Sequence, residues 1–216
     1  MLIGITVQKI KHPNYKEYGN YLNLKWYEFA KRIGIELIIL NNLKIIDQFF
    51  MSKKIKGVIL SGGGNLSYNF PKICKNKSLG NVDIERERVE KKIIELSLNQ
   101  NIPLLGVCRG MQAIGMFFGS KIFKVKNHVQ SRHRLSYYCP ITKKKVVRTV
   151  NSYHNYGFTV TSLAKDFEAN AITDNVVEKM IHKKNKILCL MWHPEREVRF
   201  SKHDLELFEK FFNIKK

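Results

Sequence analysis

Residues 106–110 of this chain read Gly-Val-Cys-Arg-Gly and stand between two patterned stretches. The apolar run Ile102–Val107 predicts a short buried strand, and the spacing of apolar residues in Met111–Phe118 predicts a helix. A cysteine with a glycine two positions away on each side fits a strained strand-to-helix turn that holds the side chain above the edge of a sheet. The helix N-terminus that follows favours a thiolate. Cys108 is therefore a candidate nucleophile, and the bland alternative is a small buried cysteine that fills a tight turn.

Short apolar runs and amphipathic stretches alternate through the rest of the first half, which indicates a parallel sheet with helices on both faces. We expect strands and helices, in chain order, at Leu2–Val7, Tyr21–Arg32, Glu36–Leu40, Gly57–Leu60 and Asp83–Asn99, with Asp83 capping the last helix. The second half has the alternation of antiparallel strands at Arg134–Tyr138, Lys145–Val150 and Gly157–Thr161, followed by a strand at Ile187–Trp192 and a helix at Ser201–Phe212. The prediction is one α/β domain over residues 1–216, with a mostly parallel central sheet and a small antiparallel addition.

Positive charge dominates the composition of the chain. Its 216 residues include 38 Lys and Arg against 18 Asp and Glu, which gives a formal net charge of +20. The basic residues are scattered rather than gathered on one element among aromatic residues, so we expect no nucleic-acid partner. The field of such a protein favours an anionic ligand, and a phosphorylated small molecule fits that preference.

Other features of the composition exclude several classes of protein. No apolar run approaches the roughly 18 to 20 residues that a membrane-spanning helix needs, so we expect a cytoplasmic protein without membrane association. The four cysteines are far apart in sequence, which argues against a disulfide framework or a zinc ribbon. They are Cys74, Cys108, Cys139 and Cys189. Nothing in the sequence fixes the oligomeric state.

A thiolate needs a base, and the sequence offers one directly after the predicted strand Ile187–Trp192. His193, Pro194 and Glu195 follow that strand, so His193 emerges at the same edge of the sheet as Cys108 if the two strands are parallel. Pro194 keeps the segment extended, which lets Glu195 reach the imidazole and fix its tautomer. Taken alone, His193, Pro194 and Glu195 fit a solvated turn better than a catalytic site. Together with Cys108 they indicate a catalytic set.

A nucleophile that attacks a carbonyl also needs donors for the oxyanion. The backbone amide of Arg109 follows the candidate nucleophile, and the loop Ser61–Gly64, Ser-Gly-Gly-Gly, offers a second amide at Gly63. Such a loop is otherwise an ordinary turn or a phosphate cradle. The Gly-Lys-Ser/Thr spacing of a nucleotide-hydrolysing loop is absent.

Four segments in this order resemble the class I glutamine amidotransferase family: Ser61–Gly64, Gly106–Gln112, Val150–His154 and Trp192–Glu195. Within that family they are similar to the stand-alone γ-glutamyl hydrolases. The resemblance implies a flavodoxin-like sheet and a triad of Cys108, His193 and Glu195. It also implies that Gln112, Asn151 and Ser152 hold the α-amino and α-carboxylate ends of a γ-glutamyl group, and that Arg86 and Glu90 are supports rather than catalysts. His154 either lines the same pocket or is structural.

The chemistry that this resemblance implies is hydrolysis of a γ-glutamyl amide through a thioester, with release of glutamate and without a metal or an organic cofactor. Three features are similar to those of family members that act on N5-(cytidine 5′-diphosphoramidyl)-L-glutamine in capsule biosynthesis. They are the lysine-rich composition, the segment Val150–His154 and a basic segment, residues 121–134. The basic segment is otherwise a solvated charged loop. Three alternatives stay open: hydrolysis of γ-glutamyl amines, a glutaminase subunit that feeds ammonia to a separate synthase, and a non-catalytic binding module.

Overall fold

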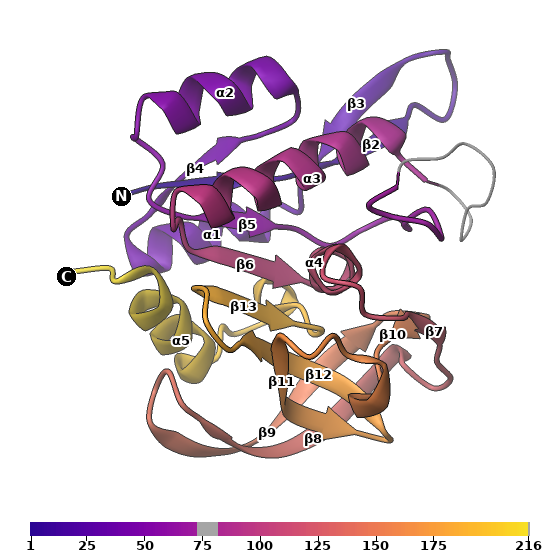
Figure 1. Cartoon of the computed structure of the whole chain (residues 1–216), viewed down its shortest axis with the longest axis vertical. Helices are drawn as coiled ribbons and strands as arrows, with labels where there is room; N and C mark the ends of the chain where they lie inside the picture. The colour runs from indigo at the N-terminus through magenta and orange to yellow at the C-terminus, as the bar shows by residue number, and fades with distance from the viewer. Residues whose placement is uncertain (73–81, 216) are drawn as a thin grey trace.

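The computed structural model describes residues 1–72 and 82–215, and Cys74 lies outside these ranges. A seven-stranded sheet runs through the middle of the molecule in the order β11-β12-β13-β6-β5-β1-β4 (Figure 1). Five of its strands pair in parallel: β1 (Leu2–Ile5), β4 (Glu36–Ile39), β5 (Val58–Leu60), β6 (Leu104–Val107) and β13 (Ile187–Leu190). The antiparallel edge is formed by β11 (Phe167–Thr173) and β12 (Val176–His182). The predicted α/β fold with a mostly parallel sheet is confirmed.

Helices cover both faces of this sheet because its central strands are apolar on both sides. One face packs against α1 (Lys25–Ile33) and α5 (Lys202–Phe212). The other face packs against α2 (Leu43–Met51), α3 (Ile84–Asn99) and α4 (Arg109–Phe117). Successive residues of β6 show the alternation, since Leu104 packs on the α2–α4 side and Leu105 on the α1–α5 side.

Three two-stranded sheets are added to this core. They pair β2 (Gln8–Lys11) with β3 (Tyr18–Tyr21), β8 (Val129–Cys139) with β9 (Lys144–Tyr153), and β7 (Phe123–Lys124) with β10 (Tyr156–Gly157). Short 3-10 helices lie at Val160–Ser162 and Pro194–Arg196. The predicted antiparallel addition is therefore present, and its longest part is the β8–β9 hairpin.

Several boundaries differ from the prediction. The first helix begins at Lys25 rather than Tyr21, because Tyr21 ends β3 and pairs with Gln8. The predicted strand at residues 157–161 is wrong, since β10 ends at Gly157 and the chain turns into a 3-10 helix at Val160. The cap of α3 is confirmed, because the Asp83 side chain accepts a hydrogen bond from the Arg86 amide at 3.1 Å. Helix α2 and the strands β2, β3, β11 and β12 were not predicted.

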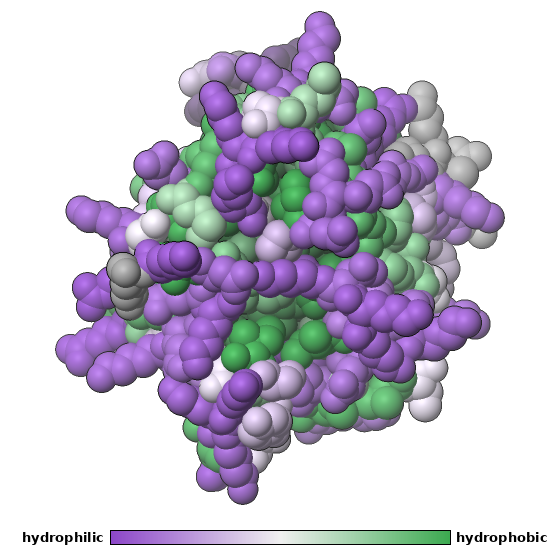
Figure 2. Space-filling model, turned by 60° about the vertical axis from the view of Figure 1, so that its left-hand side comes forward, coloured by the Kyte–Doolittle hydropathy of each residue, from purple (hydrophilic) through white to green (hydrophobic). Residues whose placement is uncertain are grey.

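Charged side chains are spread over the surface. On the face in Figure 2, hydrophilic side chains lie across the whole outline, and apolar groups show mainly between them. This distribution agrees with the scattered lysines of the sequence. Among residues 1–72 and 82–215, no helix is both long and apolar enough to cross a bilayer.

Candidate active site

Cys108 occupies a strained turn between β6 and α4. Its φ of 51° lies in the left-handed region, which is costly for a residue with a side chain and is common at functional sites. The flanking glycines are required by close packing. A Cβ on Gly106 would lie 2.7 Å from the carbonyl carbon of Gly110, and a Cβ on Gly110 would collide with the Leu60 carbonyl. The two glycines therefore let the turn pack against β5 and hold Cys108 at the carboxyl edge of the sheet.

His193 and Glu195 reach the same edge because β13 pairs in parallel with β6. The Cys108 amide donates to the Leu190 carbonyl at 2.8 Å, which continues the pairing to the end of both strands. Nδ1 of His193 lies 2.7 Å from Oε1 of Glu195, and both side chains are buried. The structure thus brings together the three residues that the sequence proposed as a triad.

The charge balance of this group favours a protonated imidazole. Burial acts to lower the pKa of His193, but the Glu195 carboxylate and the Cys108 sulfur outweigh it and raise that pKa to about 9. His193 is therefore cationic at neutral pH. It can donate its proton to a leaving group as the bond between that group and carbon breaks.

Asn151 holds the backbone of His193 from both sides. Its Oδ1 accepts from the His193 amide at 2.8 Å, and its Nδ2 donates to the His193 carbonyl at 2.8 Å and to Oε1 of Glu197 at 2.9 Å. The hydroxyl of Ser152 donates to the carbonyl of His128 at 2.7 Å. Both side chains are buried, so the structure places Asn151 and Ser152 behind the site rather than at the surface of its cavity.

The glycine loop after β5 is held by a buried arginine. The guanidinium of Arg86 donates to the carbonyls of Ser61 at 2.6 Å, Gly62 at 3.2 Å and Gly63 at 2.9 Å. Burial lowers the pKa of Arg86 to about 10, which leaves it charged at neutral pH. Three carbonyls of the loop thus turn toward Arg86, the Ser61 amide donates to Oγ1 of Thr6 at 3.1 Å, and Gly63 and Gly64 line the same cavity as Cys108.

Glu90 connects this support to the turn that carries Cys108. Its carboxylate accepts from Nε of Arg86 at 2.7 Å and forms a second ion pair with Arg109, whose Nε donates to the Asn65 carbonyl at 3.1 Å. These contacts are those expected of supporting residues. They fix the glycine loop and the first residue after Cys108 relative to each other.

A cavity of about 250 Å³ opens above Cys108. It is lined by Gly63, Gly64, Asn65, Cys108, Arg109, Gln112, Tyr153, His154, Asn155, Tyr156, His193 and Arg196. Gln112 is therefore where the sequence placed it, although its Nε2 donates to the Tyr156 carbonyl at 2.8 Å. The cavity is small, polar and enclosed by the elements that carry the candidate triad.

Sequence reasoning missed Tyr153 and Arg196. The guanidinium of Arg196 lies 5.0 Å from the centre of the Tyr153 ring, and that ring packs edge-on against His193. Nε of Arg196 makes no hydrogen bond with any residue that the structure describes. Arg196 directly follows Glu195 in a 3-10 turn, and this position next to a candidate carboxylate was the available signal.

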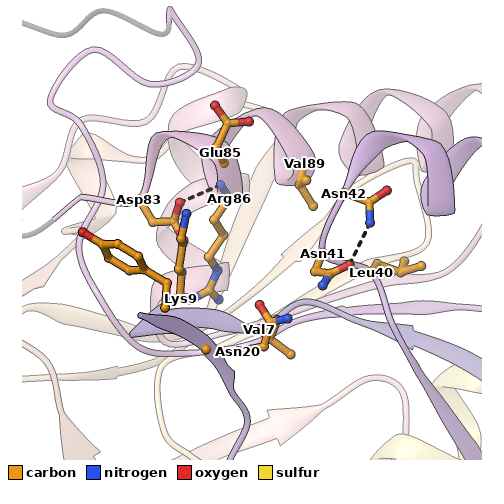
Figure 3. Close-up of a pocket in the computed structure, with 12 residues that line it drawn as sticks. Val7, Lys9, Asn20, Leu40, Asn41, Asn42, Asp83, Glu85, Arg86 and Val89 are labelled. Atoms are coloured by element: carbon orange, nitrogen blue, oxygen red, sulfur yellow. Dashed lines mark hydrogen bonds between the residues drawn. The ribbon is translucent and has the colours of Figure 1, made fainter. Parts of the chain in front are cut away.

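A second cavity, of about 380 Å³, lies at the carboxyl ends of β1 and β4 (Figure 3). Val7, Leu40 and Val89 form its apolar part. Its polar lining consists of Lys9, Tyr18, Asn20, Asn41, Asn42, Asp83, Glu85 and Arg86. Arg86 belongs both to this cavity and to the support of the glycine loop, and the loop residues Gly63 and Gly64 line the cavity above Cys108.

Comparisons with known proteins agree with this geometry. The family model described as Peptidase C26 matches residues 1–195. The γ-glutamyl-CDP-amidate hydrolase of Campylobacter jejuni is 34% identical, over 99% of this chain and 98% of that protein. One subunit of the glutamine-hydrolysing GMP synthase of Methanocaldococcus jannaschii is 26% identical, over 91% of this chain and 93% of that protein. A solved structure described as a putative GMP synthase subunit from Thermoplasma acidophilum has a TM-score of 0.68 at 20% identity, over 99% of this chain and 94% of that one.

Proposed function

The chain belongs to the Peptidase C26 family, and from this membership we propose how its own residues cleave a γ-glutamyl amide and in which substrate. The family and the 34% identity to a γ-glutamyl-CDP-amidate hydrolase identify it as a cysteine-type amide hydrolase. The observation that carries the residue assignment is the single cluster at the carboxyl edge of β6 and β13, where Cys108, His193 and Glu195 meet.

In this mechanism the sulfur of Cys108 attacks the δ-carbonyl carbon of a γ-glutamyl amide. Amides of Arg109 and Gly63 donate to the oxyanion, and loss of one such donor costs on the order of a hundred- to a thousand-fold in rate. His193 gives its proton to the departing nitrogen, while Glu195 stabilises the imidazolium. A water that His193 then deprotonates attacks the thioester, which releases glutamate and regenerates the thiolate.

The polar cavity above Cys108 suits the glutamyl part of the substrate. Arg196 lines this cavity, and a guanidinium can bind a carboxylate through two parallel hydrogen bonds. We assign the α-carboxylate to Arg196 and the α-amino end to Gln112, which lines the same cavity. Asn151 acts instead as a positioning residue for His193.

For the leaving group we propose cytidine diphosphoramidate, released from N5-(cytidine 5′-diphosphoramidyl)-L-glutamine. The support is that the similarity to the Campylobacter jejuni hydrolase extends over 99% of this chain, together with the net charge of +20. The basic segment 121–134 is less suited to phosphate binding than its sequence indicated. Its Arg132 pairs with Glu197 at 3.1 Å, and its His128 and His133 are buried.

The cavity in Figure 3 is better placed for the nucleotide. Lys9 supplies an ammonium group to its lining, and its amides and the Tyr18 side chain suit a base and a ribose. Asp83 and Glu85 belong to the same lining and would repel a phosphate, so we place the diphosphate near Lys9 and the nucleoside toward Asn41.

Release of glutamate from three substrates tests the proposal: glutamine, a γ-glutamyl amine and the cytidine diphosphoramidyl compound. Cys108→Ala should abolish all three activities while the circular dichroism spectrum is kept, and turnover by that variant would refute the mechanism. Lys9→Ala should raise KM for the nucleotide compound alone, with the exposed Lys145→Ala as the matched control. An equal effect of Lys9→Ala on all three substrates would refute the placement of the nucleotide.

One alternative has a specific observation in its favour. The similarity to the Methanocaldococcus jannaschii GMP synthase subunit favours a glutaminase that feeds ammonia to a separate synthase. That function predicts weak glutamine hydrolysis by the chain alone and little preference for the nucleotide compound, so the same substrate panel separates the two.

A further inference from the structure

Two imidazoles and a carboxylate meet at the wall of the catalytic cavity, which His154 lines. His128 lies just before β8, His154 just after β9, and Glu178 is in β12. Nδ1 of His128 is 3.2 Å from Nε2 of His154 and 3.2 Å from Oε1 of Glu178, and the third side of this triangle is 3.4 Å. The exposed fractions of the three residues are 1%, 3% and 0%, so the cluster is inaccessible to bulk water.

The available protons do not satisfy this cluster. Nδ1 of His154 faces the Tyr156 carbonyl at 3.0 Å, which assigns its proton to that contact and leaves a lone pair on Nε2. One proton on Nδ1 of His128 then faces two acceptors, Nε2 of His154 and Oε1 of Glu178. Neither oxygen of Glu178 accepts a well-formed hydrogen bond from any residue that the structure describes. A buried carboxylate in that condition is rare and destabilising.

The three polar atoms therefore converge on one small volume, at 3.2, 3.2 and 3.4 Å from one another. A cation at the centre would engage all three groups once the proton on Nδ1 of His128 has moved to the other nitrogen of that ring, because a metal ligand must offer a lone pair.

The spacing of the three atoms suits a tetrahedral ion. Ligands about 2.0–2.1 Å from a tetrahedral Zn²⁺ lie roughly 3.3–3.4 Å from one another, which matches the triangle here. Two imidazoles and one carboxylate are also a ligand set that Zn²⁺ accepts, with water in the fourth position. We propose that His128, His154 and Glu178 form a binding site for one divalent transition-metal ion, with Zn²⁺ as the preferred ion.

Contacts around the triangle resemble the outer shell of a metal site. The carbonyl of Tyr156 orients the His154 ring, as carbonyl groups commonly do for histidine ligands. The same carbonyl accepts the side-chain amide of Gln112, which lines the catalytic cavity. An ion would thus tie β8, β9 and β12 together and fix the cavity wall, and no step of hydrolysis passes through it.

The test uses the full chain after dialysis against a chelator, with Zn²⁺ and Co²⁺ as probes. We expect one equivalent of Zn²⁺ by mass spectrometry, a visible absorption band of tetrahedral Co²⁺, and a higher melting temperature with Zn²⁺. Cys108→Ala should retain all three properties, which excludes binding at the catalytic thiol. The matched control His12→Ala, at a histidine stacked on Tyr15, should also retain them.

Loss of a ligand should weaken binding by more than the roughly 10–100-fold that loss of an outer-shell partner costs. Glu178→Gln keeps the volume of the side chain and removes its charge, and His128→Asn serves as a second variant if the first does not fold. Absence of stoichiometric Zn²⁺ binding by the wild-type chain would overturn the proposal and favour a trapped proton. Wild-type affinity in folded Glu178→Gln or His128→Asn would overturn it as well.

Discussion

Substitution of Asn151 by alanine tests whether this side chain positions His193 or binds the substrate. The position of Asn151 in the sequence does not distinguish these two roles. The side chain makes two hydrogen bonds to the His193 backbone, each at 2.8 Å. Alanine leaves the buried N–H of His193 unpaired, whereas the His193 carbonyl keeps the hydrogen bond from the Arg196 amide at 3.1 Å. An unpaired buried donor costs about 1–3 kcal/mol, so we expect the free energy of unfolding to fall by that amount.

The effect on catalysis should appear in kcat. Without Asn151 the His193 backbone is free to shift, and a displacement of about 1 Å in a catalytic group costs on the order of a hundred-fold in rate. KM should change little, since the side chain is buried behind the cavity and does not line it. Rates of Cys108 alkylation measured across a pH series give a second readout, because a displaced imidazole alters the reactivity of the thiol.

Asn155→Ala is the matched control, because Asn155 is exposed and lines the cavity. We measure glutamate release at several substrate concentrations for both variants, at a temperature where urea titration shows each to be folded. A rise in KM with unchanged kcat for Asn151→Ala would refute the positioning role and restore the substrate contact that the sequence resemblance implied.

Three further predictions rest on the same site. The pKa of His193 in the folded chain, about 9, lies above its ordinary value of 6.5, so its stabilising effect is complete below pH 6.5 and is lost as the pH rises through 9. Urea unfolding at pH 6.5 and 9.5 should differ by about 3 kcal/mol, and an equal difference in Glu195→Gln would contradict this assignment. Gly110→Ala should lower the melting temperature strongly or prevent folding, because its Cβ collides with the Leu60 carbonyl, and near-native melting would disprove the steric argument. Arg86→Met should lower kcat about a hundred-fold by releasing the glycine loop, and full activity in steady-state assays would show that the loop keeps its conformation unaided.

Local patterns were sufficient to predict the central part of the fold. The apolar run before Cys108, the helical spacing after it and Asp83 as a cap each depend on neighbours within one or two turns, and all three are confirmed. The β2–β3 hairpin was missed because its residues are mostly exposed and carry no apolar alternation. Tyr21 was assigned to the following helix for the same reason.

Long-range contacts account for what the sequence did not reveal about the site. The hydrogen bonds between Asn151 and His193 join residues 42 positions apart, and no spacing rule encodes such a pair. Glu178 lies in a buried strand whose other residues gave no sign of chemistry, and it becomes a candidate ligand only when β12 packs beside the β8–β9 hairpin. Arg86 was expected to be a support, but the three carbonyls that it holds follow only from the fold.

The pairing of β6 with β13 fixes the geometry at one cavity, whereas the second cavity is bordered by peripheral elements. The proposed nucleophile and base, Cys108 and His193, follow two adjacent, hydrogen-bonded strands, so their relative position is set by the centre of the sheet. The second cavity is bordered by a peripheral hairpin, β2–β3, and by the exposed ends of other strands. Exchange of that hairpin between related enzymes should therefore transfer the preference for a leaving group while the bond-breaking chemistry stays the same.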